Sequence, residues 1–425
     1  MSTEFDWFVG IDWATRAHEV CILDASGTVV QRHSVPHSGD GLKDLVARLV
    51  RLCGGLIDRV AVGIEVPHGA VVETLLERGF AVFSVNPKQL DRFRDRFSPA
   101  GAKDDRLDAR VIGDSLRTDR RCFRRLAAQP TQIIRLRELV RAEAELKEEL
   151  QRFSNRLRDL LHRYYPQVLA LSPAADEPWL WDLLHRAPTP AKGRRLHQAT
   201  LEQLLRRHRI RRIVAHDLRQ ALCETPLQLA PGTVDAVSER VGSLVPRLQL
   251  AHRQLGQLQQ RIEALLEELA EPAESATDGP DGQTREHRDV EILLSAPGVG
   301  RVTVATMLAQ ANQAIQDRDY HIIRAQSGLA PITKSSGQSR RVQMRYACDE
   351  RLRNAFYHMA RVASICDESA RCYYQELRGR GHSHGRALRA VADRQLRILM
   401  AMLREGTLYD AQRCLRSSSV PTKVA

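Results

Sequence analysis

Two stretches in the middle of the chain repeat apolar residues at alternating steps of three and four. This spacing is typical of long helices that bury one seam against a partner helix, either within one chain or between two. Glu143 takes the one polar position of the first seam, and Pro246 interrupts the second, so we expect the second continuous helix to begin at Pro246. The seam residues are Leu136, Leu139, Leu146, Leu150, Phe153, Leu157, Leu160 and Tyr164 in the first stretch, and Val237, Val241, Leu244, Leu248, Ala251, Leu255, Leu258, Ile262, Leu265 and Leu269 in the second.

These seams divide the 425 residues into a predicted series of domains. The seams themselves indicate a long coiled-coil spacer that also serves as an oligomerisation arm. A Pro- and Ala-rich stretch, Ser172–Lys192, breaks the first seam and marks an inserted segment. The predicted order is an N-terminal domain at 1–127, the arm at 128–270 with its insertion at 170–235, a polar linker at 271–289, a C-terminal domain at 290–410 and a tail at 411–425.

The N-terminal domain alternates strand and helix patterns in the order βββαβαβα. Short apolar runs bounded by turn residues predict the strands, and apolar residues at helical spacing predict the helices. This order is typical of a mixed sheet flanked by helices. The expected elements are strands at Phe8–Asp12, His18–Asp24, Thr28–Val35, Arg59–Glu65 and Ala81–Val85, and helices at Leu42–Val50, Val71–Arg78 and Asp105–Arg117.

Charge and composition restrict the class of protein. The net charge is +12, and residues 301–425 hold 21 Lys and Arg against 10 Asp and Glu, which predicts a polyanionic partner for the C-terminal third. No apolar run reaches membrane-spanning length, and the N-terminus does not resemble a secretory signal. The eight cysteines form no CxxC pair, so we expect neither a disulfide framework nor a zinc site. These features predict a cytoplasmic protein.

Four carboxylates of the N-terminal domain fall at positions that favour metal binding. Asp12 and Glu65 each end a predicted strand, and Asp105 and Asp108 share one face of a predicted helix. Hard cations such as Mg²⁺ or Mn²⁺ relieve the repulsion among such acids and can assist displacement at a phosphodiester. Taken singly, each acid could instead be a turn residue or a helix cap. Asp104 could take the place of Asp105.

A Ser- and Gly-containing stretch with basic flanks is the main chemical feature of the C-terminal domain. Residues 328–341 read GLAPITKSSGQSRR, which we interpret as a loop able to cradle a phosphate. A serine beside a glycine in this stretch has an accessible hydroxyl, which could attack phosphorus if a base or a metal activates it. A flexible, solvated loop is the alternative.

Pro297-Gly298-Val299-Gly300 precedes a predicted helix and resembles the turn of a helix-hairpin-helix. The N-terminus of such a helix binds a backbone phosphate. A glycine-rich turn inside a helical core is the alternative. Two amphipathic helices with Arg on one face are expected further on, at Arg351–Ser364 and Gly385–Leu403.

Six motifs, in order, resemble the insertion sequence 110 family of transposases, which are DEDD-type recombinases related to the Piv DNA invertases. The resemblance covers residues 5–165 and 290–410. It is carried by GIDWAT, GIEVPHG and KDDRLDARVIGD in the N-terminal half, and by LLSAPGVGRVTVATML, AQSGLAPITKSSGQSRR and RLRNAFYHMA in the C-terminal half.

The resemblance implies an RNase H-like, RuvC-like α/β domain and a mostly α transposase domain. It implies that the DEDD acids bind Mg²⁺ or Mn²⁺ and that Ser336, with Ser335 as the fallback, forms a transient phosphoserine link to DNA. It also implies a composite site with the serine supplied by another protomer of a dimer or tetramer, and a structured noncoding guide (bridge) RNA. In this reading the acids are Asp12, Glu65, Asp105 and Asp108, and the residues that contact nucleic acid are Arg340, Arg341, Arg351, Arg353, Gly298 and Gly300.

The sequence departs from the family pattern in two places. Residues 170–290 are longer than the family leads us to expect, and Tyr346–Glu350 stands where a Lys-Arg-Gly-Asn-like turn is usual. Three alternatives to a DNA recombinase of a mobile element are a RuvC-like junction nuclease that uses water, a nucleic-acid-binding protein with an inactive metal site, and a sugar-kinase or actin-like ATPase. The last would need a second Gly-rich phosphate loop, which the sequence does not show.

Overall fold

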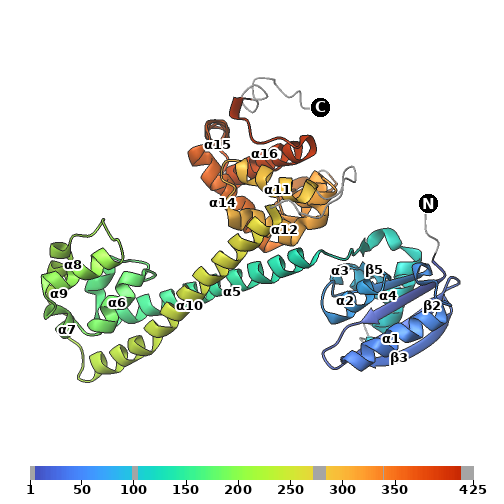
Figure 1. Cartoon of the computed structure of the whole chain (residues 1–425), viewed down its shortest axis with the longest axis horizontal. Helices are drawn as coiled ribbons and strands as arrows, with labels where there is room; N and C mark the ends of the chain where they lie inside the picture. The colour runs from blue at the N-terminus through green and yellow to red at the C-terminus, as the bar shows by residue number, and fades with distance from the viewer. Residues whose placement is uncertain (1–4, 98–103, 271–283, 338, 413–425) are drawn as a thin grey trace. The chain divides into compact units, whose positions relative to one another are not determined.

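The fold is that of a computed structural model, which describes residues 5–97, 104–270, 284–337 and 339–412. The chain forms two compact units, the first ending at Pro130 and the second beginning at Thr131. We describe each unit by itself (Figure 1).

Unit 1 is built on a six-stranded mixed sheet with the strand order β3-β2-β1-β4-β5-β6. The first three strands form an antiparallel meander, β4 and β5 continue parallel to β1, and the two-residue β6 closes the edge antiparallel to β5. The predicted mixed sheet is confirmed. The strands are β1 Trp7–Asp12, β2 Ala17–Asp24, β3 Val29–Pro36, β4 Val60–Ile64, β5 Ala81–Ser84 and β6 Arg124–Arg125.

Helices cover both faces of this sheet. Val9 and Ile11 of β1 pack into one apolar cluster with α1 and α2, whereas Phe8 joins the opposite cluster with α3 and α4. This alternation along β1 follows from the two-residue period of a strand. The sequence predicted three of these helices and missed α3. Their bounds are α1 Gly39–Leu52, α2 Ala70–Glu77, α3 Pro87–Arg94 and α4 Asp105–Thr118.

Helix α4 lies directly on the backbone of β1. A Cβ atom added to Gly10 would stand 1.9 Å from the Ala109 carbonyl oxygen, and one added to Gly113 would stand 3.0 Å from the Gly10 nitrogen. A Cβ added to Gly63 of β4 would meet the Ile112 side chain at 2.7 Å. Glycine at these positions therefore sets the depth at which α4 sits on the sheet.

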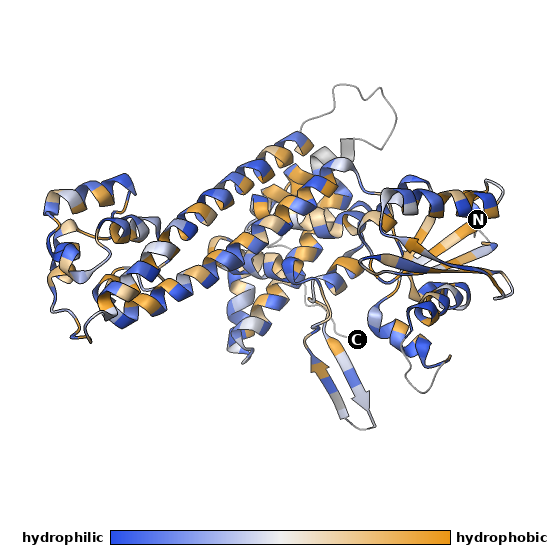
Figure 2. Cartoon of the chain, turned by 90° about the horizontal axis from the view of Figure 1, so that it is seen from below, coloured by the Kyte–Doolittle hydropathy of each residue, from blue (hydrophilic) through white to orange (hydrophobic). Residues whose placement is uncertain are grey.

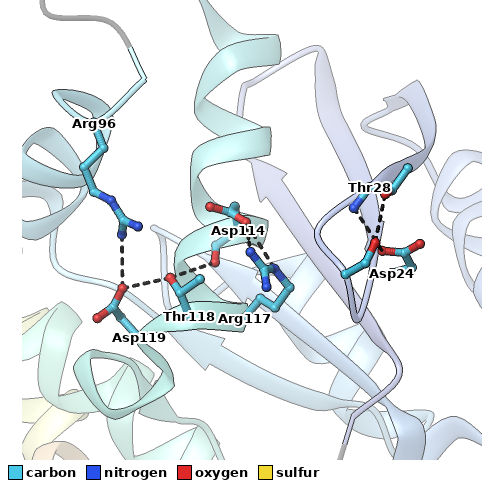
Figure 3. A network of polar contacts seen from close by, with 8 residues as sticks. Asp24, Thr28, Arg96, Asp114, Arg117, Thr118 and Asp119 are labelled. Atoms are coloured by element: carbon cyan, nitrogen blue, oxygen red, sulfur yellow. Dashed lines mark hydrogen bonds and ion pairs between the residues drawn. The ribbon is translucent and has the colours of Figure 1, made fainter.

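Polar contacts fix the C-terminal end of α4 (Figure 3). Arg117 donates to Asp114 at 2.7 Å, and its guanidinium lies against the turn at Gly27, where a Cβ would come within 2.8 Å of it. Asp119, which follows the helix, accepts from Arg96 at 3.1 Å and from Thr118 at 2.8 Å. The hydroxyl of Thr118 is the main cause of the lowered pKa of Asp119.

Replacing Gly10 with alanine should destabilise unit 1. The new methyl group would collide with backbone atoms of α4, so we expect a loss of about 3 kcal/mol in the free energy of unfolding, measured by urea denaturation. Gly39→Ala is the matched control, because a Cβ at Gly39 would meet nothing within 4 Å. A loss in Gly10→Ala no larger than in the control would contradict the close packing.

In unit 2, the two predicted seams lie on two long helices that pair within the chain. Helix α5 spans Thr131–Tyr164 and α10 spans Thr233–Ala270. The start of α5 shares a core with the end of α10, and the end of α5 shares another with the start of α10, so the helices run antiparallel. Glu143, which is 3% exposed, forms an ion pair with Lys147 at 2.7 Å and accepts from Gln259 at 3.3 Å.

The expectation that the second helix begins at Pro246 is wrong. Helix α10 begins at Thr233 and continues through this proline. Pro246 is exposed, whereas Leu244, Val245 and Leu248 around it are buried. Burial of these side chains outweighs the one helical hydrogen bond that a proline removes.

The segment between α5 and α10 folds into a small helical cap (Figure 1). Two fully buried tryptophans, Trp179 and Trp181, and the buried Tyr164 and Tyr165 form the centre of its core. The indole of Trp181 donates to the Ala175 carbonyl at 3.0 Å. The cap consists of a short 3-10 helix at Pro166–Ala170 and the helices α6 Pro178–Arg186, α7 Pro190–Arg194, α8 Gln198–Arg207 and α9 Ala215–Cys223.

The other end of the α5–α10 pair joins the C-terminal helices in one apolar core. Arg137 of α5 donates to the Ala309 carbonyl at 2.9 Å, close to a kink of α12 at Ala311. Arg318 forms two hydrogen bonds, of 2.6 and 2.7 Å, to the buried Asp289. The C-terminal elements are α11 Thr284–Ser295, α12 Arg301–Gln316, α13 Tyr320–Gln326, β7 Ile332–Ser336, β8 Ser339–Gln343, α14 Glu350–Cys366, α15 Glu368–Gly379 and α16 His384–Glu405.

Within the part of the chain that the structure describes, no helix combines the length and the apolar character needed to cross a membrane.

Candidate active site

The sheet of unit 1 places two of the predicted acids side by side along its edge. Strands β1 and β4 are parallel neighbours, with Ile11 paired to Ile64 in register. Asp12 and Glu65 are the next residues of these two strands, and both are half-buried. The carboxyl ends of parallel strands form a common edge, which is where open α/β sheets usually place their sites.

The first turn of α4 carries the other two acids. Asp104 is the N-cap residue and accepts from the Arg106 backbone nitrogen at 3.2 Å, so its side chain serves the helix end. Asp105 is exposed, whereas Asp108 is 3% exposed. The guanidinium of Arg106 lies 3.8 Å from Glu19, the residue paired with Asp12 across β1 and β2. The start of α4 therefore lies at the same end of β1 as Asp12.

Asp108 is held by an arginine that the sequence did not single out. Arg94, the last residue of α3, donates to both carboxylate oxygens of Asp108 at 2.6 and 2.9 Å. It also donates to the exposed Asp91 at 2.8 Å. The hydrogen bond to Asp108 is the main cause of the raised pKa of Arg94. The buried negative charge of Asp108 is thus neutralised by a cation from the protein itself.

This arrangement does not fit a bound metal ion as it stands. Carboxylates are suitable ligands for a hard divalent cation. However, Arg94 occupies both oxygens of Asp108, and among the described residues no three His, Cys, Asp or Glu side chains gather closely enough to hold a metal. The fold brings the acid-bearing elements to one edge of the sheet, where Arg94 holds the carboxylate of Asp108.

A pair of histidines packs beside the loop that follows Asp12. His18, which is fully buried, accepts from the Ala14 backbone nitrogen at 3.3 Å, and its second nitrogen lies 2.9 Å from a ring nitrogen of His37. The Trp13 ring lies 6.3 Å from that of His18. Burial is the main cause of the lowered pKa of His18. The two histidines thus support the loop, a role that sequence analysis missed because His18 lies on β2 and His37 follows the end of β3, 19 residues further along the chain.

Removing Arg94 should expose the dependence of Asp108 on a cation. In Arg94→Ala the carboxylate stays buried without its partner, so we expect unit 1 to lose about 3 kcal/mol of unfolding free energy. Mn²⁺ should then raise the melting temperature of Arg94→Ala more than that of the unaltered protein, because the ion no longer competes with the guanidinium.

Two variants control this experiment. Arg96→Ala removes an arginine whose partner, Asp119, is more exposed, and should cost less than about 1 kcal/mol. Adding Asp108→Asn to Arg94→Ala should abolish the extra response to Mn²⁺. An equal Mn²⁺ response with and without Arg94 would show that Arg94 does not compete for a metal site.

In unit 2, the predicted serine lies at the end of a β-hairpin rather than in a loop. Ser336 is the last residue of β7 and pairs with Ser339, the first residue of β8. Gly337 in the turn has a φ of +54°, a left-handed conformation that glycine adopts at little cost. Ser335 and Ser336 are both exposed, and the hairpin extends from the helices of the unit (Figure 2). The expectation of a phosphate-cradling loop is therefore wrong at the level of the backbone.

The predicted DNA-contacting arginines lie along and beyond this hairpin. In the β7–β8 register Arg340 is paired with Ser335 and Arg341 with Lys334, and the Arg341 side chain is exposed. Arg351 is half-buried in the first turn of α14. Arg353 is engaged within the chain, since it forms an ion pair with Glu350 at 2.8 Å and a contact with the Cys348 sulfur at 3.5 Å.

The two glycines of the predicted helix-hairpin-helix turn have different surroundings. The turn connects α11 to α12, as expected. A Cβ on Gly298 would stand 2.4 Å from the Met359 carbonyl oxygen of α14, so Gly298 serves close packing within the unit. Gly300 is exposed at the N-cap of α12, where a Cβ would meet nothing within 4 Å.

Two sequence models of one transposase family match the chain. Residues 9–166 match the DEDD model for IS110, described as a transposase, and residues 290–375 match the model described as the transposase of the IS116/IS110/IS902 family. The first match covers the sheet and α4, and the second covers the Ser336 hairpin. Neither matched segment includes residues 167–289.

Relatives from insertion elements match over different lengths. The candidate transposase y4uE of Sinorhizobium fredii is 47% identical over 216 residues, which cover 51% of this chain and 60% of that protein. The candidate mini-circle transposase for IS117 of Streptomyces coelicolor is 31% identical over 414 residues, 96% of each chain. A 43.6 kDa protein of insertion element IS110 from Streptomyces coelicolor is 31% identical over 95% of this chain and 96% of its own.

The chain therefore belongs to the IS110 family of insertion-sequence transposases. It is a DNA transposase, and DNA is its substrate. Its DEDD class is generally dependent on a divalent metal.

Proposed function

We propose that this transposase cuts and rejoins DNA through attack by Ser336 on a phosphodiester. The observation that carries the proposal is the position of Ser336, exposed at the tip of a hairpin that also bears Arg340 and Arg341. A serine hydroxyl is accessible there to a DNA backbone. Arginines on the strand paired with that of Ser336 supply the positive charge that the phosphates require.

In the proposed reaction, the Ser336 hydroxyl oxygen forms a bond to phosphorus, and the bond from phosphorus to one deoxyribose oxygen breaks. The hydroxyl proton leaves, and the departing deoxyribose oxygen takes up a proton. The product is a phosphoserine ester with a free DNA hydroxyl. Attack on this ester by the hydroxyl of another DNA end restores the serine and joins the strands, so no external energy source is needed.

We propose further that Asp12, Glu65, Asp105 and Asp108 bind a divalent cation, Mg²⁺ or Mn²⁺, once Arg94 releases Asp108. When bound, such an ion supplies positive charge to phosphate oxygens and lowers the pKa of an attacking hydroxyl. Without it, Arg94 keeps Asp108 compensated, which preserves the fold of unit 1. The strand order β3-β2-β1-β4-β5 supports the RNase H-like assignment of that unit.

The hairpin supports the proposal of a composite site in an oligomer. A two-stranded hairpin is marginally stable by itself, and β7 is exposed along nearly its whole length. We propose that it docks against DNA and the N-terminal unit of another protomer in a dimer or tetramer, and that the α5–α10 pair acts as a coiled-coil arm in that assembly. We also propose that a noncoding guide RNA selects the target DNA.

A transposase of this kind would act on DNA of the nucleoid, in the cytoplasm.

The serine assignment is tested by trapping the protein–DNA adduct. The full chain is incubated with duplex DNA carrying the element ends, Mg²⁺ and any transcript of the element, and the adduct is mapped by peptide mass. Ser336→Ala should reduce adduct formation on the order of a thousandfold or more, because the nucleophile is gone. Ser339→Ala, which changes the residue paired with Ser336, should form the adduct at close to the normal level.

Two results would contradict this assignment. An adduct that persists in Ser336→Ala and maps to Ser335 or to a tyrosine would move the nucleophile. Cleavage that persists in Ser336→Ala without any adduct would favour the alternative, a RuvC-like nuclease that uses water.

A further inference from the structure

The cap between α5 and α10 carries a dense concentration of positive charge. Residues 190–219 contain nine Lys and Arg against two Asp and Glu. This concentration lies outside the two segments that match the transposase models. It belongs to α7, α8 and α9 and to the segments that connect them, and it is distinct from the basic residues of the Ser336 hairpin.

Some of these arginines are used inside the cap. Arg212 donates to both carboxylate oxygens of Glu177 at 2.6 and 2.7 Å. Arg194 and Arg219 donate to backbone carbonyls at 3.0 and 3.1 Å. Arg207 lies 3.7 Å from Asp182. These side chains hold the helices of the cap together.

Three other arginines are arranged differently. Arg206, Arg209 and Arg211 are exposed, and within the described part of the chain none of them forms an ion pair with a carboxylate. All three line one surface hollow of about 490 Å³ at the turn between α8 and α9. One carboxylate, Glu202, lines the same hollow and accepts from Gln198 at 3.0 Å. The hollow is therefore positive, with three guanidinium groups against one acid.

The backbone at Arg209 is held in a conformation that disfavours arginine. Its φ is +53°. The Arg209 nitrogen donates to the Arg206 carbonyl at 3.0 Å, and the Ile210 nitrogen donates to the Leu205 carbonyl at 2.9 Å. This is the Schellman ending of a helix, in which glycine is the usual residue at the left-handed position. An arginine at this position makes the fold less stable than a glycine would, and in return its side chain is held at a fixed place on the turn.

A second arginine in the same conformation shows what such a residue does when its role is structural. Arg318, two residues after the last residue of α12, has a φ of +54° and the same pair of backbone hydrogen bonds. Its guanidinium binds the buried Asp289 on both oxygens. Arg209 has the strained backbone without such a carboxylate, so its side chain is directed at something outside the chain.

We propose that the α8–α9 turn is a second nucleic-acid-binding surface, which binds the phosphate backbone of duplex DNA. Planar guanidinium groups bind phosphate oxygens in pairs, and three of them on one turn match the charge of adjacent phosphates. Duplex DNA is the polyanion that the family handles. Along α5, the buried residues of the C-terminal core end at Val140 and those of the cap core begin at Leu157, 17 residues or about 26 Å further on, so this surface is separate from the core that carries the Ser336 hairpin.

The test uses the full chain and a 40-base-pair duplex of arbitrary sequence, with binding measured by fluorescence anisotropy over a series of salt concentrations. Arg209→Gly and Arg211→Ala should each weaken binding and reduce the slope of log K against log salt by about 0.9, and the double variant by about twice as much. Arg253→Ala, which removes the same charge from the exposed face of α10, is the control and should leave the slope unchanged.

Thermal denaturation separates a binding role from a structural one. Arg209→Gly should leave the melting temperature unchanged or raise it, because glycine relaxes the left-handed backbone. Arg318→Gly should lower it, because Asp289 loses its partner.

Three results would overturn the proposal. Unchanged salt slopes in Arg209→Gly and Arg211→Ala would exclude the contact, and a lower melting temperature in Arg209→Gly would make Arg209 structural. Weakened binding of single-stranded RNA with unchanged duplex binding would replace DNA by RNA as the partner. Binding is read without cleavage, so the result is independent of the Ser336 proposal.

Discussion

The contact between the backbones of α4 and β1 determines how unit 1 presents its acids. Because Gly10 and Gly113 have no side chains, the helix sits on the strand at backbone distance. The start of α4 then falls at the end of β1 where Asp12 lies, and Asp108 becomes buried there. A buried carboxylate needs a compensating charge, and Arg94 provides it. The glycines thus allow the close packing that buries Asp108, and the burial of Asp108 requires Arg94.

Most of the fold could be predicted from the sequence because apolar periodicity dominates it. The first five strands of the sheet and both long helices followed from short apolar runs and from apolar residues at steps of three and four, whereas the parallel pairing of β1 with β4 is known only from the structure. Helix α3 escaped because its eight residues, PKQLDRFR, show little apolar repetition. The start of α10 was predicted wrongly because proline usually begins or breaks a helix. The burial of the residues around Pro246, which outweighs that tendency, depends on packing in the folded chain and cannot be read from the local sequence.

For the candidate site, the sequence predicted the acidic residues but not the side chains that contact them. The order of the acids along the chain indicated a common edge, which the register of β1 and β4 supports. The partner of Asp108 could not be foreseen, since Arg94 lies on the helix that the periodicity missed. The positive charge of the cap was missed because charge was summed over long segments. Residues 1–300 hold 43 Lys and Arg against 42 Asp and Glu, so their net charge is close to zero.

The antiparallel course of α5 and α10 has an evolutionary consequence. The chain leaves and re-enters the pair at one end, so the cap is a module whose two attachment points are neighbours. Such a module can grow, shrink or be exchanged between related elements while the catalytic apparatus stays intact. Changes in the cap would alter how such an element binds DNA in a new genome. The residues that carry out strand exchange would not have to change with it.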